Sequence, residues 1–244
     1  MQIITTAVIK GGTGKTATAA AIAQAAAADG KKVLIVDLDP QANLTYTVAA
    51  DQNKAGAFQL FNGTPAAQLI QHTAQCIDAI AASPDLTTVK TAAGSAKRLQ
   101  EALNPLRSLY DICIIDTPPV MGELVFNALQ AADGLLIPLE ADTYSLQGLY
   151  QITDIAHQMQ RSNPKLSIIG VVISRYDARP NISRYMKDVI AEKGAEIGAP
   201  FLMAIRPAIA VKEAAAFQQS LFEYAPNSKP AADFMQLYKM ITKK

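Results

Sequence analysis

The chain has 244 residues, of which 50% are hydrophobic and 18% are charged, so it can bury a substantial core without disulfides or metal ions. Its 22 basic and 21 acidic side chains leave a formal charge of +1, and it contains 13 glycines and 13 prolines. These figures exclude a disordered, collagen-like or polybasic chain, so any contact with nucleic acid must come from a local basic patch.

Short aliphatic or β-branched runs alternate along the chain with longer segments of helical period. This alternation predicts βαβ units and therefore an α/β fold, with a mainly parallel sheet flanked by helices on both faces. Each run is mostly apolar on both faces, as a parallel strand covered by helices requires. The predicted strands are residues 3–8, 33–37, 112–116, 134–138, 168–174 and 201–205.

Predicted helices fall between these strands. They are residues 15–29, 96–103, 122–131, 144–161, 182–193 and 231–242. Residues 49–95 are the least regular part of the chain, with a short helix expected after Pro65. Because no repeat is visible and no linker divides the sequence, we predict one domain over residues 1–244.

A glycine-rich loop follows the first predicted strand and precedes the first predicted helix. It reads K-G-G-T-G-K-T over residues 10–16. Its glycines allow several N–H groups to point at one phosphate, Lys15 can reach the β- and γ-phosphates, and the Thr16 hydroxyl can hold Mg²⁺. The strict pattern G-x-x-x-x-G-K-[ST] fails, because Ile9 stands at its first position. A chance Gly/Lys turn is the alternative, but the order of strand, loop and helix favours a P-loop.

Carboxylates stand where two further predicted strands end. Asp37 and Asp39 come at the end of the second strand, and Asp116 ends the third. Ligands collect at the carboxyl edge of an open α/β sheet, so Asp37 and Asp39 could both face a γ-phosphate. The alternatives are a simple Asp-Pro turn at Asp39 and a solvated strand-end carboxylate at Asp116.

The loop resembles the deviant Walker A motif of the ParA/MinD family of ATPases, which includes the partition proteins ParA/Soj. Four later segments are similar to that family in the same order: D-L-D-P-Q-A-N at 37–43, D-T-P-P at 116–119, Y-S-L-Q-G-L at 144–149 and Y-D-A-R-P-N at 176–181. The last two resemble the soluble ParA/Soj branch in particular. The resemblance implies a P-loop ATPase that uses ATP and Mg²⁺ and hydrolyses ATP weakly until a partner stimulates it.

The resemblance also implies roles for single residues. Asp39 would position or activate the attacking water, Thr16 would ligate Mg²⁺ directly, and Asp116 would hold the ion through water. Lys10 would reach across a dimer interface to the partner's nucleotide, with an exposed loop charge as the alternative. The implied catalytic residues are Lys10, Lys15 and Asp39, and the implied nucleotide-binding residues are Lys10, Gly11, Gly12, Thr13, Gly14, Lys15, Thr16 and Ala17. Adenine is the expected base because no N-K-x-D segment is visible, and Ser174 is a possible base contact.

Partners follow from the same resemblance: an ATP-dependent homodimer, nonspecific DNA in the ATP state with nucleoid association, and a ParB-like activating protein. The candidate DNA contacts are Arg175, Arg179, Arg184, Lys187 and Lys212. Arg184 and Lys187 lie three residues apart on a predicted helix, so one basic face is reasonable, and a solvated helix face is the alternative. Residues 205–214 depart from the family, with two basic positions replaced and the Pro-Arg order inverted.

Two competing hypotheses remain beside plasmid or chromosome partition. One is a ParA-like positioning switch that acts on a protein or membrane cargo with little DNA affinity. The other is a nucleotide-dependent metabolic enzyme on the same fold. No helix-turn-helix segment precedes the first strand, so we do not expect binding to a specific DNA sequence.

The remaining sequence features favour a soluble cytoplasmic protein. No apolar run reaches 18 residues, and the first eight residues lack the pattern of a signal peptide. The two cysteines, Cys76 and Cys113, lack partners at metal-ligand spacing, so we expect packed thiols in a reducing compartment. The C-terminal segment has apolar residues at helical spacing before Lys243 and Lys244, and we expect it to close the core without stable membrane association.

Overall fold

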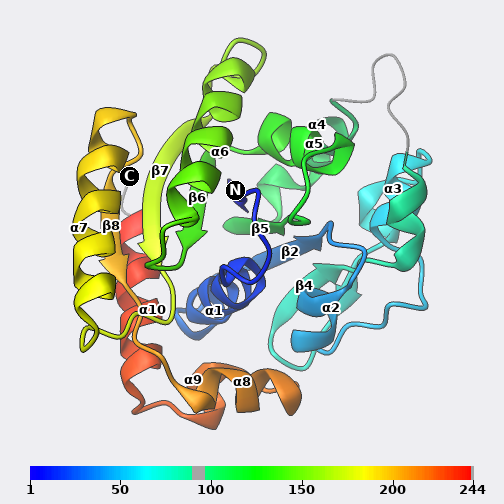
Figure 1. The fold of residues 1–244 in the computed structure, drawn as a ribbon. Coiled ribbons are helices and arrows are strands. Elements are labelled where there is room, and N and C mark those ends of the chain that lie inside the picture. Colours follow the sequence, from blue (N-terminus) through cyan, green and yellow to red (C-terminus); the bar gives the residue numbers. More distant parts are fainter. Residues whose placement is uncertain (90–96, 243–244) are drawn as a thin grey trace.

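The fold is taken from a computed structural model that describes residues 1–89 and 97–242. Over these residues the strands form one eight-stranded sheet in the order β3-β4-β2-β5-β1-β6-β7-β8. Every neighbouring pair is parallel except β3 and β4, which are antiparallel. Helices cover both faces of the sheet (Figure 1), so the predicted fold class is confirmed.

The six predicted strands are all present in the sheet. They are β1 (Gln2–Thr6), β2 (Val33–Asp37), β5 (Ile112–Asp116), β6 (Gly134–Leu139), β7 (Ser167–Ile173) and β8 (Phe201–Ala204). The bounds of β2 and β5 agree with the prediction residue for residue, and the others differ by one or two residues at one or both ends. The two strands that the sequence did not predict are β3 (Gln71–His72) and β4 (Ile77–Ile80), both in the irregular region.

The six predicted helices are also present. They are α1 (Lys15–Ala28), α4 (Arg98–Leu103), α5 (Glu123–Ala131), α6 (Ser145–Met159), α7 (Asn181–Glu196) and α10 (Lys229–Ile241). The start of the predicted helix 96–103 falls at Ala96, outside the described residues. The short helix expected after Pro65 is the 3₁₀ helix η1 (Ala66–Gln68), and two further 3₁₀ helices are η2 (Pro84–Thr88) and η4 (Asn104–Ser108).

Four α-helices were missed by the sequence analysis. They are α2 (Asn43–Thr47), α3 (Ala57–Phe61), α8 (Ile209–Ala216) and α9 (Leu221–Tyr224). None exceeds eight residues, which is too short to show a clear helical period, and such helices depend on tertiary packing for their stability.

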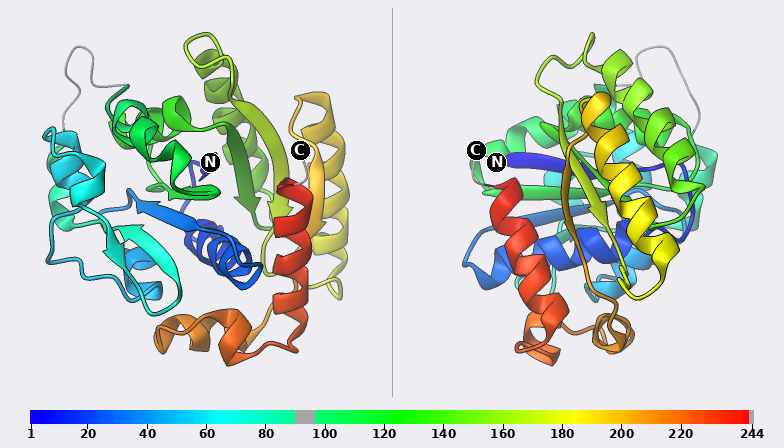
Figure 2. Two further views of the ribbon diagram at one scale, coloured as in Figure 1. Left: turned by 180° about the vertical axis from the view of Figure 1, so that it is seen from behind. Right: turned by 60° about the vertical axis from the view of Figure 1, so that its left-hand side comes forward.

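The core divides into two layers because side chains alternate along each strand. Ile3, Cys113 and Ile115 point to one face, where buried residues of α3, α4, α5, α6 and α7 pack. Ile4 and Ile114 point to the other face, which α1, α2, α8, α9 and α10 cover. On this second face α1 and α10 lie side by side (Figure 2). Both faces of the sheet are thus covered, as the doubly apolar strands predicted.

The C-terminal helix α10 belongs to the second layer. Its large apolar side chains Phe234, Leu237, Tyr238 and Ile241 are buried, which confirms that this segment closes the core. Lys243 and Lys244 lie outside the described residues. Nowhere in residues 1–89 and 97–242 does a helix combine the length and apolar character needed to cross a membrane. Cys113 is buried as expected, whereas the expectation of a packed thiol is wrong for Cys76, which is exposed in a turn before β4.

Candidate functional site

The glycine-rich loop joins β1 to α1 at the carboxyl edge of the sheet. Gly12 and Gly14 have φ angles of +77° and +87°, a left-handed backbone that strains any residue with a Cβ. A Cβ on Gly14 would also lie 2.9 Å from Ser174 Oγ. No side chain caps the N-terminus of α1, so its first N–H groups are available to an anionic ligand.

Lys15 is the first residue of α1, and its side chain folds back over the loop. Only 6% of the residue is exposed, and Nζ donates a hydrogen bond to the Lys10 carbonyl at 2.8 Å. Burial lowers the pKa of Lys15, while the charges of Asp116 and Asp39 oppose that shift. The loop contact uses one of the three ammonium donors, so the group can also serve a phosphate.

Asp116 is the last residue of β5, and a hydrogen bond links its side chain to α1. Thr16 Oγ1 donates to its Oδ2 at 2.6 Å, and Thr6 Oγ1 donates to its Oδ1 at 3.1 Å. Burial, and next the nearby charge of Asp37, raise the pKa of Asp116, whereas Thr16 and Lys15 act in the opposite direction. A cation beside this carboxylate would relieve the cost of burying its charge.

Thr16 and Asp116 fit a Mg²⁺ ion that is coordinated partly by water and phosphate better than they fit a metal ion coordinated entirely by protein side chains. Thr16 and Asp116 supply a hydroxyl and a carboxylate, which are hard oxygen donors. Within residues 1–89 and 97–242 there is no group of three or more His, Cys, Asp or Glu side chains that could hold a metal. Mg²⁺ commonly keeps several waters and shares phosphate oxygens, so it does not need such a cage.

The two carboxylates after β2 are separated by the structure. Asp37 is fully buried, and its Oδ2 accepts hydrogen bonds from both the N–H and the hydroxyl of Thr45, each at 2.8 Å. Burial raises the pKa of Asp37 despite these bonds. Asp39 instead lines a cavity, and its Oδ1 accepts a hydrogen bond from Gln41 N at 3.0 Å. Asp37 therefore fixes the start of α2, while Asp39 can meet a ligand.

That cavity has a volume of about 890 Å³, within the usual range for small-molecule sites. One wall is the P-loop and the start of α1, which we call the phosphate wall (residues 11–18). Another is the segment after β8, which we call the outer wall (residues 205–212, of which all but Ala210 line the cavity). Asp39, Gln41, Asn43, Pro119, Ser174, Arg175 and Phe234 complete the lining. The cavity combines anion-binding backbone with apolar side chains, as a nucleotide requires.

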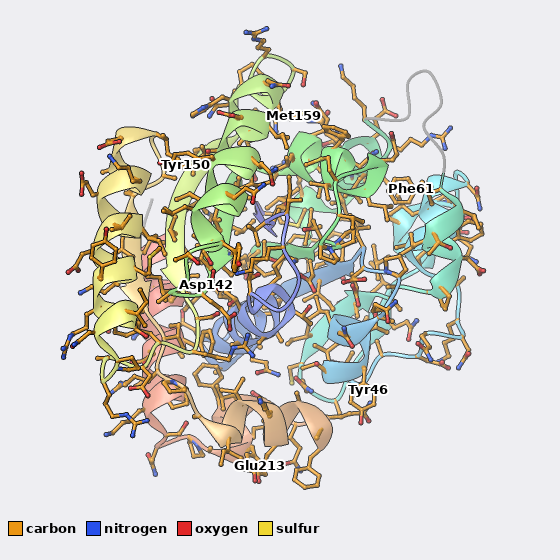
Figure 3. The ribbon with its side chains drawn as sticks, viewed as in Figure 1. Tyr46, Phe61, Asp142, Tyr150, Met159 and Glu213 are labelled. Carbon is orange, nitrogen blue, oxygen red and sulfur yellow. The ribbon has the colours of Figure 1, made fainter. Side chains whose placement is uncertain are left out.

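The outer wall is tied to the rest of the protein at its start, at Arg206 and just past its end. At its start, Ile205 N donates to the Ile173 carbonyl at 2.7 Å, and the Ile205 carbonyl accepts from Tyr176 N at 2.8 Å. Arg206 forms an ion pair with Asp233 of α10, in which Nε donates to Oδ2 at 2.9 Å. Tyr46 of α2 donates its hydroxyl to the Ala216 carbonyl at the end of α8, at 3.1 Å. Both elements can be found in Figure 3, where Tyr46 of α2 and Glu213 of α8 are labelled. Although the Pro-Arg order of this segment differs from the family, the segment still lines the cavity.

Lys10 is directed elsewhere, and it is not among the residues that line the cavity. Its Nζ lies 2.5 Å from Asp142 Oδ2 and 3.4 Å from Ser145 Oγ, with the Tyr144 ring centroid at 6.0 Å. Asp142, labelled in Figure 3, lies between β6 and α6. Burial raises the pKa of Asp142, but the hydrogen bond and charge of Lys10 outweigh this and hold it below its usual range. The two lysines of the loop therefore have different surroundings.

The five candidate DNA contacts form two groups. Arg175 and Lys212 line the cavity, whereas Arg179 lies just before α7 and Arg184 and Lys187 lie in its first two turns. Three of the five are in ion pairs: Arg175 with Glu140, Arg179 with Asp177 at 2.6 Å, and Lys187 with Asp188 at 3.2 Å. Arg184 donates to Asn181 Oδ1. Arg179, Arg184 and Lys187 are thus the members that share one region.

Several residues at the site were not identified from the sequence. Glu140 and Asp142 contact Arg175 and Lys10, and Asp233 anchors the outer wall. The first two come two and four residues after the predicted strand 134–138, so the strand-end argument applied to Asp116, extended to the following loop, would have found them. Asp233 lies within a predicted helix far along the chain, and nothing in the sequence links it to Arg206.

Comparisons with known proteins agree with this geometry. A family described as "AAA domain" matches residues 1–168. The chain is 33% identical to the chromosome-partitioning ATPase Soj of Thermus thermophilus, over 93% of this chain and 90% of that protein. It is 32% identical to the chromosome partitioning protein ParA of Myxococcus xanthus, over 96% and 86%. Among solved structures, cobyrinic acid a,c-diamide synthase from Mycobacterium smegmatis, with bound ATP analogue and magnesium, is 28% identical, with coverages of 98% and 93% and a TM-score of 0.81.

Proposed function

The chain belongs to the ParA/Soj family of P-loop ATPases, and we propose that it is a Mg²⁺-dependent partition ATPase acting on plasmid or chromosome DNA. A single domain of residues 1–244 would carry the activity. The observation that carries the proposal is the convergence of Lys15, Thr16 and Asp39 on one cavity of about 890 Å³.

The phosphate wall would bind the nucleotide through backbone N–H groups and Lys15. Phosphoryl transfer depends mostly on orientation and charge neutralisation, and Lys15 offers a buried ammonium at the loop. Mg²⁺, when bound, would neutralise phosphate charge, held by the Thr16 hydroxyl directly and by Asp116 through water. Asp39 would orient the attacking water, since its Oδ1 is steadied by Gln41 N and it faces the cavity.

Lys10 would act only in an ATP-dependent dimer. In the single chain its ammonium is held by Asp142 outside the cavity, so it does not serve its own nucleotide there. We propose that it exchanges Asp142 for the nucleotide of a second copy, which would make ATP part of the interface. Hydrolysis would then release the dimer, and a ParB-like partner would stimulate this step.

Nonspecific DNA binding in the ATP state would use the group at the start of α7. Arg179, Arg184 and Lys187 could contact phosphates there, and such contacts carry no sequence preference. The measurement is retention on mixed-sequence DNA with Mg-ATP, with Mg-ADP and without nucleotide, at several salt concentrations. We expect retention only with Mg-ATP, falling steeply as salt rises.

A positioning switch with little DNA affinity is the second candidate. It is favoured by the local pairing of Arg179 with Asp177 and of Lys187 with Asp188, which reduces the net charge of the basic group. ATP-dependent dimerisation without DNA retention at low salt would support this candidate over DNA partition. A metabolic role has less support, because the two partition relatives are more similar in sequence than the synthase.

A further inference from the structure

The end of β7 holds the P-loop at two neighbouring carbonyl groups. Ser174 Oγ donates to the Thr13 carbonyl at 2.6 Å and also lies 3.1 Å from the Leu139 carbonyl. The next residue, Arg175, donates from Nη2 to the Gly12 carbonyl and to Glu140 Oε1. Two residues after β7 therefore bind two consecutive peptide groups of the loop.

These contacts orient the loop's N–H groups. In a trans peptide the carbonyl and the following N–H point in opposite directions. When the Gly12 carbonyl is held toward Arg175, the N–H of Thr13 must point away from Arg175. The Thr13 carbonyl, held by Ser174, orients the N–H of Gly14 in the same way. Convergent N–H groups of this kind are what bind a phosphate.

The backbone of Arg175 supports a specific role for its side chain. Its φ is +52°, a left-handed conformation that is uncommon for residues other than glycine. Unfavourable backbone persists where surrounding contacts fix it, and such positions cluster at ligand sites. Here the left-handed turn comes directly after β7, at the residue whose guanidinium meets the loop.

Glu140 provides the second half of the arrangement. It follows β6, the strand next to β7, and its Oε1 accepts from the same Nη2 that reaches the Gly12 carbonyl. A charged acceptor strengthens a hydrogen bond and limits the positions the guanidinium can take. The ends of two neighbouring strands thus fix one donor against the loop.

We propose that Arg175, anchored by Glu140, is a positioning residue that holds the P-loop in its phosphate-binding shape, and that it is not a DNA contact. The inference rests on the proposed function in one respect, namely that the ligand is a nucleotide with at least two phosphates. It assigns Arg175 to the nucleotide site and leaves the start of α7 as the candidate DNA region.

The test compares Arg175→Ala, Arg175→Lys and Glu140→Gln with wild type, by calorimetric titration with ATP, ADP and AMP in the presence of Mg²⁺. Alanine keeps the Cβ, so the backbone strain at this position is unchanged and only the guanidinium is lost. We expect ATP and ADP to bind about tenfold more weakly to Arg175→Ala, with AMP changed less than threefold. Arg175→Lys should recover part of the loss, because an ammonium can satisfy one acceptor.

Arg161→Ala is the matched control, since Arg161 is an exposed arginine in the turn between α6 and β7, outside the cavity lining. It should leave all three affinities unchanged. If Arg175→Ala fails to fold, judged by thermal unfolding without nucleotide, Arg175→Lys and Glu140→Gln carry the test through reduced ADP affinity.

Unchanged ADP affinity in every folded variant would overturn the inference, as would a loss of DNA retention in Arg175→Ala with wild-type nucleotide affinity. Failure of the proposed function is distinguishable, because wild-type protein would then either bind no ATP or bind ATP without being retained on DNA, whereas the inference fails on the nucleotide affinities of the variants.

Discussion

The phosphate wall and the outer wall line the same cavity but are held in different ways. The phosphate wall connects a buried central strand to a helix that is buried over most of its length. Thr16 binds it to the end of β5, and Ser174 and Arg175 bind it to the end of β7. The outer wall is hydrogen-bonded at Ile205 to the end of β7. After that residue it is held by the Arg206–Asp233 pair and, just past its end, by the contact of Tyr46 with Ala216, and its Ile209 is 73% exposed.

The difference indicates that one wall is built into the fold and the other is attached to it. Backbone within a sheet and a buried helix cannot move without breaking many contacts. A segment held by an ion pair at its edge can shift at lower cost. We therefore expect phosphate binding to be insensitive to changes in the outer wall, whereas recognition of the rest of the nucleotide depends on it.

The largest effect is expected from Lys15→Ala, which removes the ammonium from the phosphate wall. ATP affinity should fall at least about a hundredfold, because the charge that neutralises the β- and γ-phosphates is deleted. Calorimetric titration with Mg-ATP measures it, with Arg161→Ala as control. An affinity close to wild type would show that the loop is not the phosphate site.

Asp39→Ala separates binding from hydrolysis at the same wall. Turnover should fall about a hundredfold or more while ATP binding is retained, because Asp39 is assigned to the water. Phosphate release and titration on the same preparation measure both quantities. If turnover matched wild type, the water would have to be positioned by another residue.

The Asp39→Ala background also tests Lys10, since slow hydrolysis preserves any ATP-bound dimer. Adding Lys10→Ala should abolish the ATP-dependent increase in mass seen by light scattering while leaving ATP affinity within about threefold. Asp142→Ala is the matched control, because it removes the other half of the ion pair and leaves Lys10 in place. Full dimerisation of the Lys10→Ala, Asp39→Ala protein would exclude a role across the interface.

Arg206→Ala tests the outer wall, because it removes the ion pair that holds this segment against α10. Its guanidinium no longer holds Asp233, so ATP should bind about tenfold more weakly. Inorganic triphosphate, which has no base, should bind as it does to wild type. Equal losses for both ligands would mean that the two walls are not independent.

The smallest effect is expected from Ile209→Ala. This side chain lines the cavity but is 73% exposed, so it can offer a ligand only part of its apolar surface. ATP affinity should fall about threefold, in line with a modest loss of apolar contact. Calorimetric titration of Ile209→Ala and Arg206→Ala with Mg-ATP under the same conditions measures this loss. A loss of affinity as large as that of Arg206→Ala would indicate that Ile209 closes over the nucleotide.

The sequence by itself determined the fold class, six of the helices and the central strands. Doubly apolar runs such as Val33–Asp37 and Ile112–Asp116 can exist only between two helical layers, so local composition was sufficient. It also determined the P-loop, because left-handed glycines, a helix start and a lysine must follow one another in the chain.

Tertiary structure decided what depends on contacts between distant segments. The short strand β4 is stable because it pairs with β2, and α8 because it packs on the second face of the sheet. The position of Arg175 at the loop and the pairing of Lys10 with Asp142 join residues more than 130 positions apart. The sequence specifies the type of each side chain but not its contact partner. The partner depends on which strand ends lie next to each other at the carboxyl edge of the sheet, and the strand order β5-β1-β6-β7 determines this.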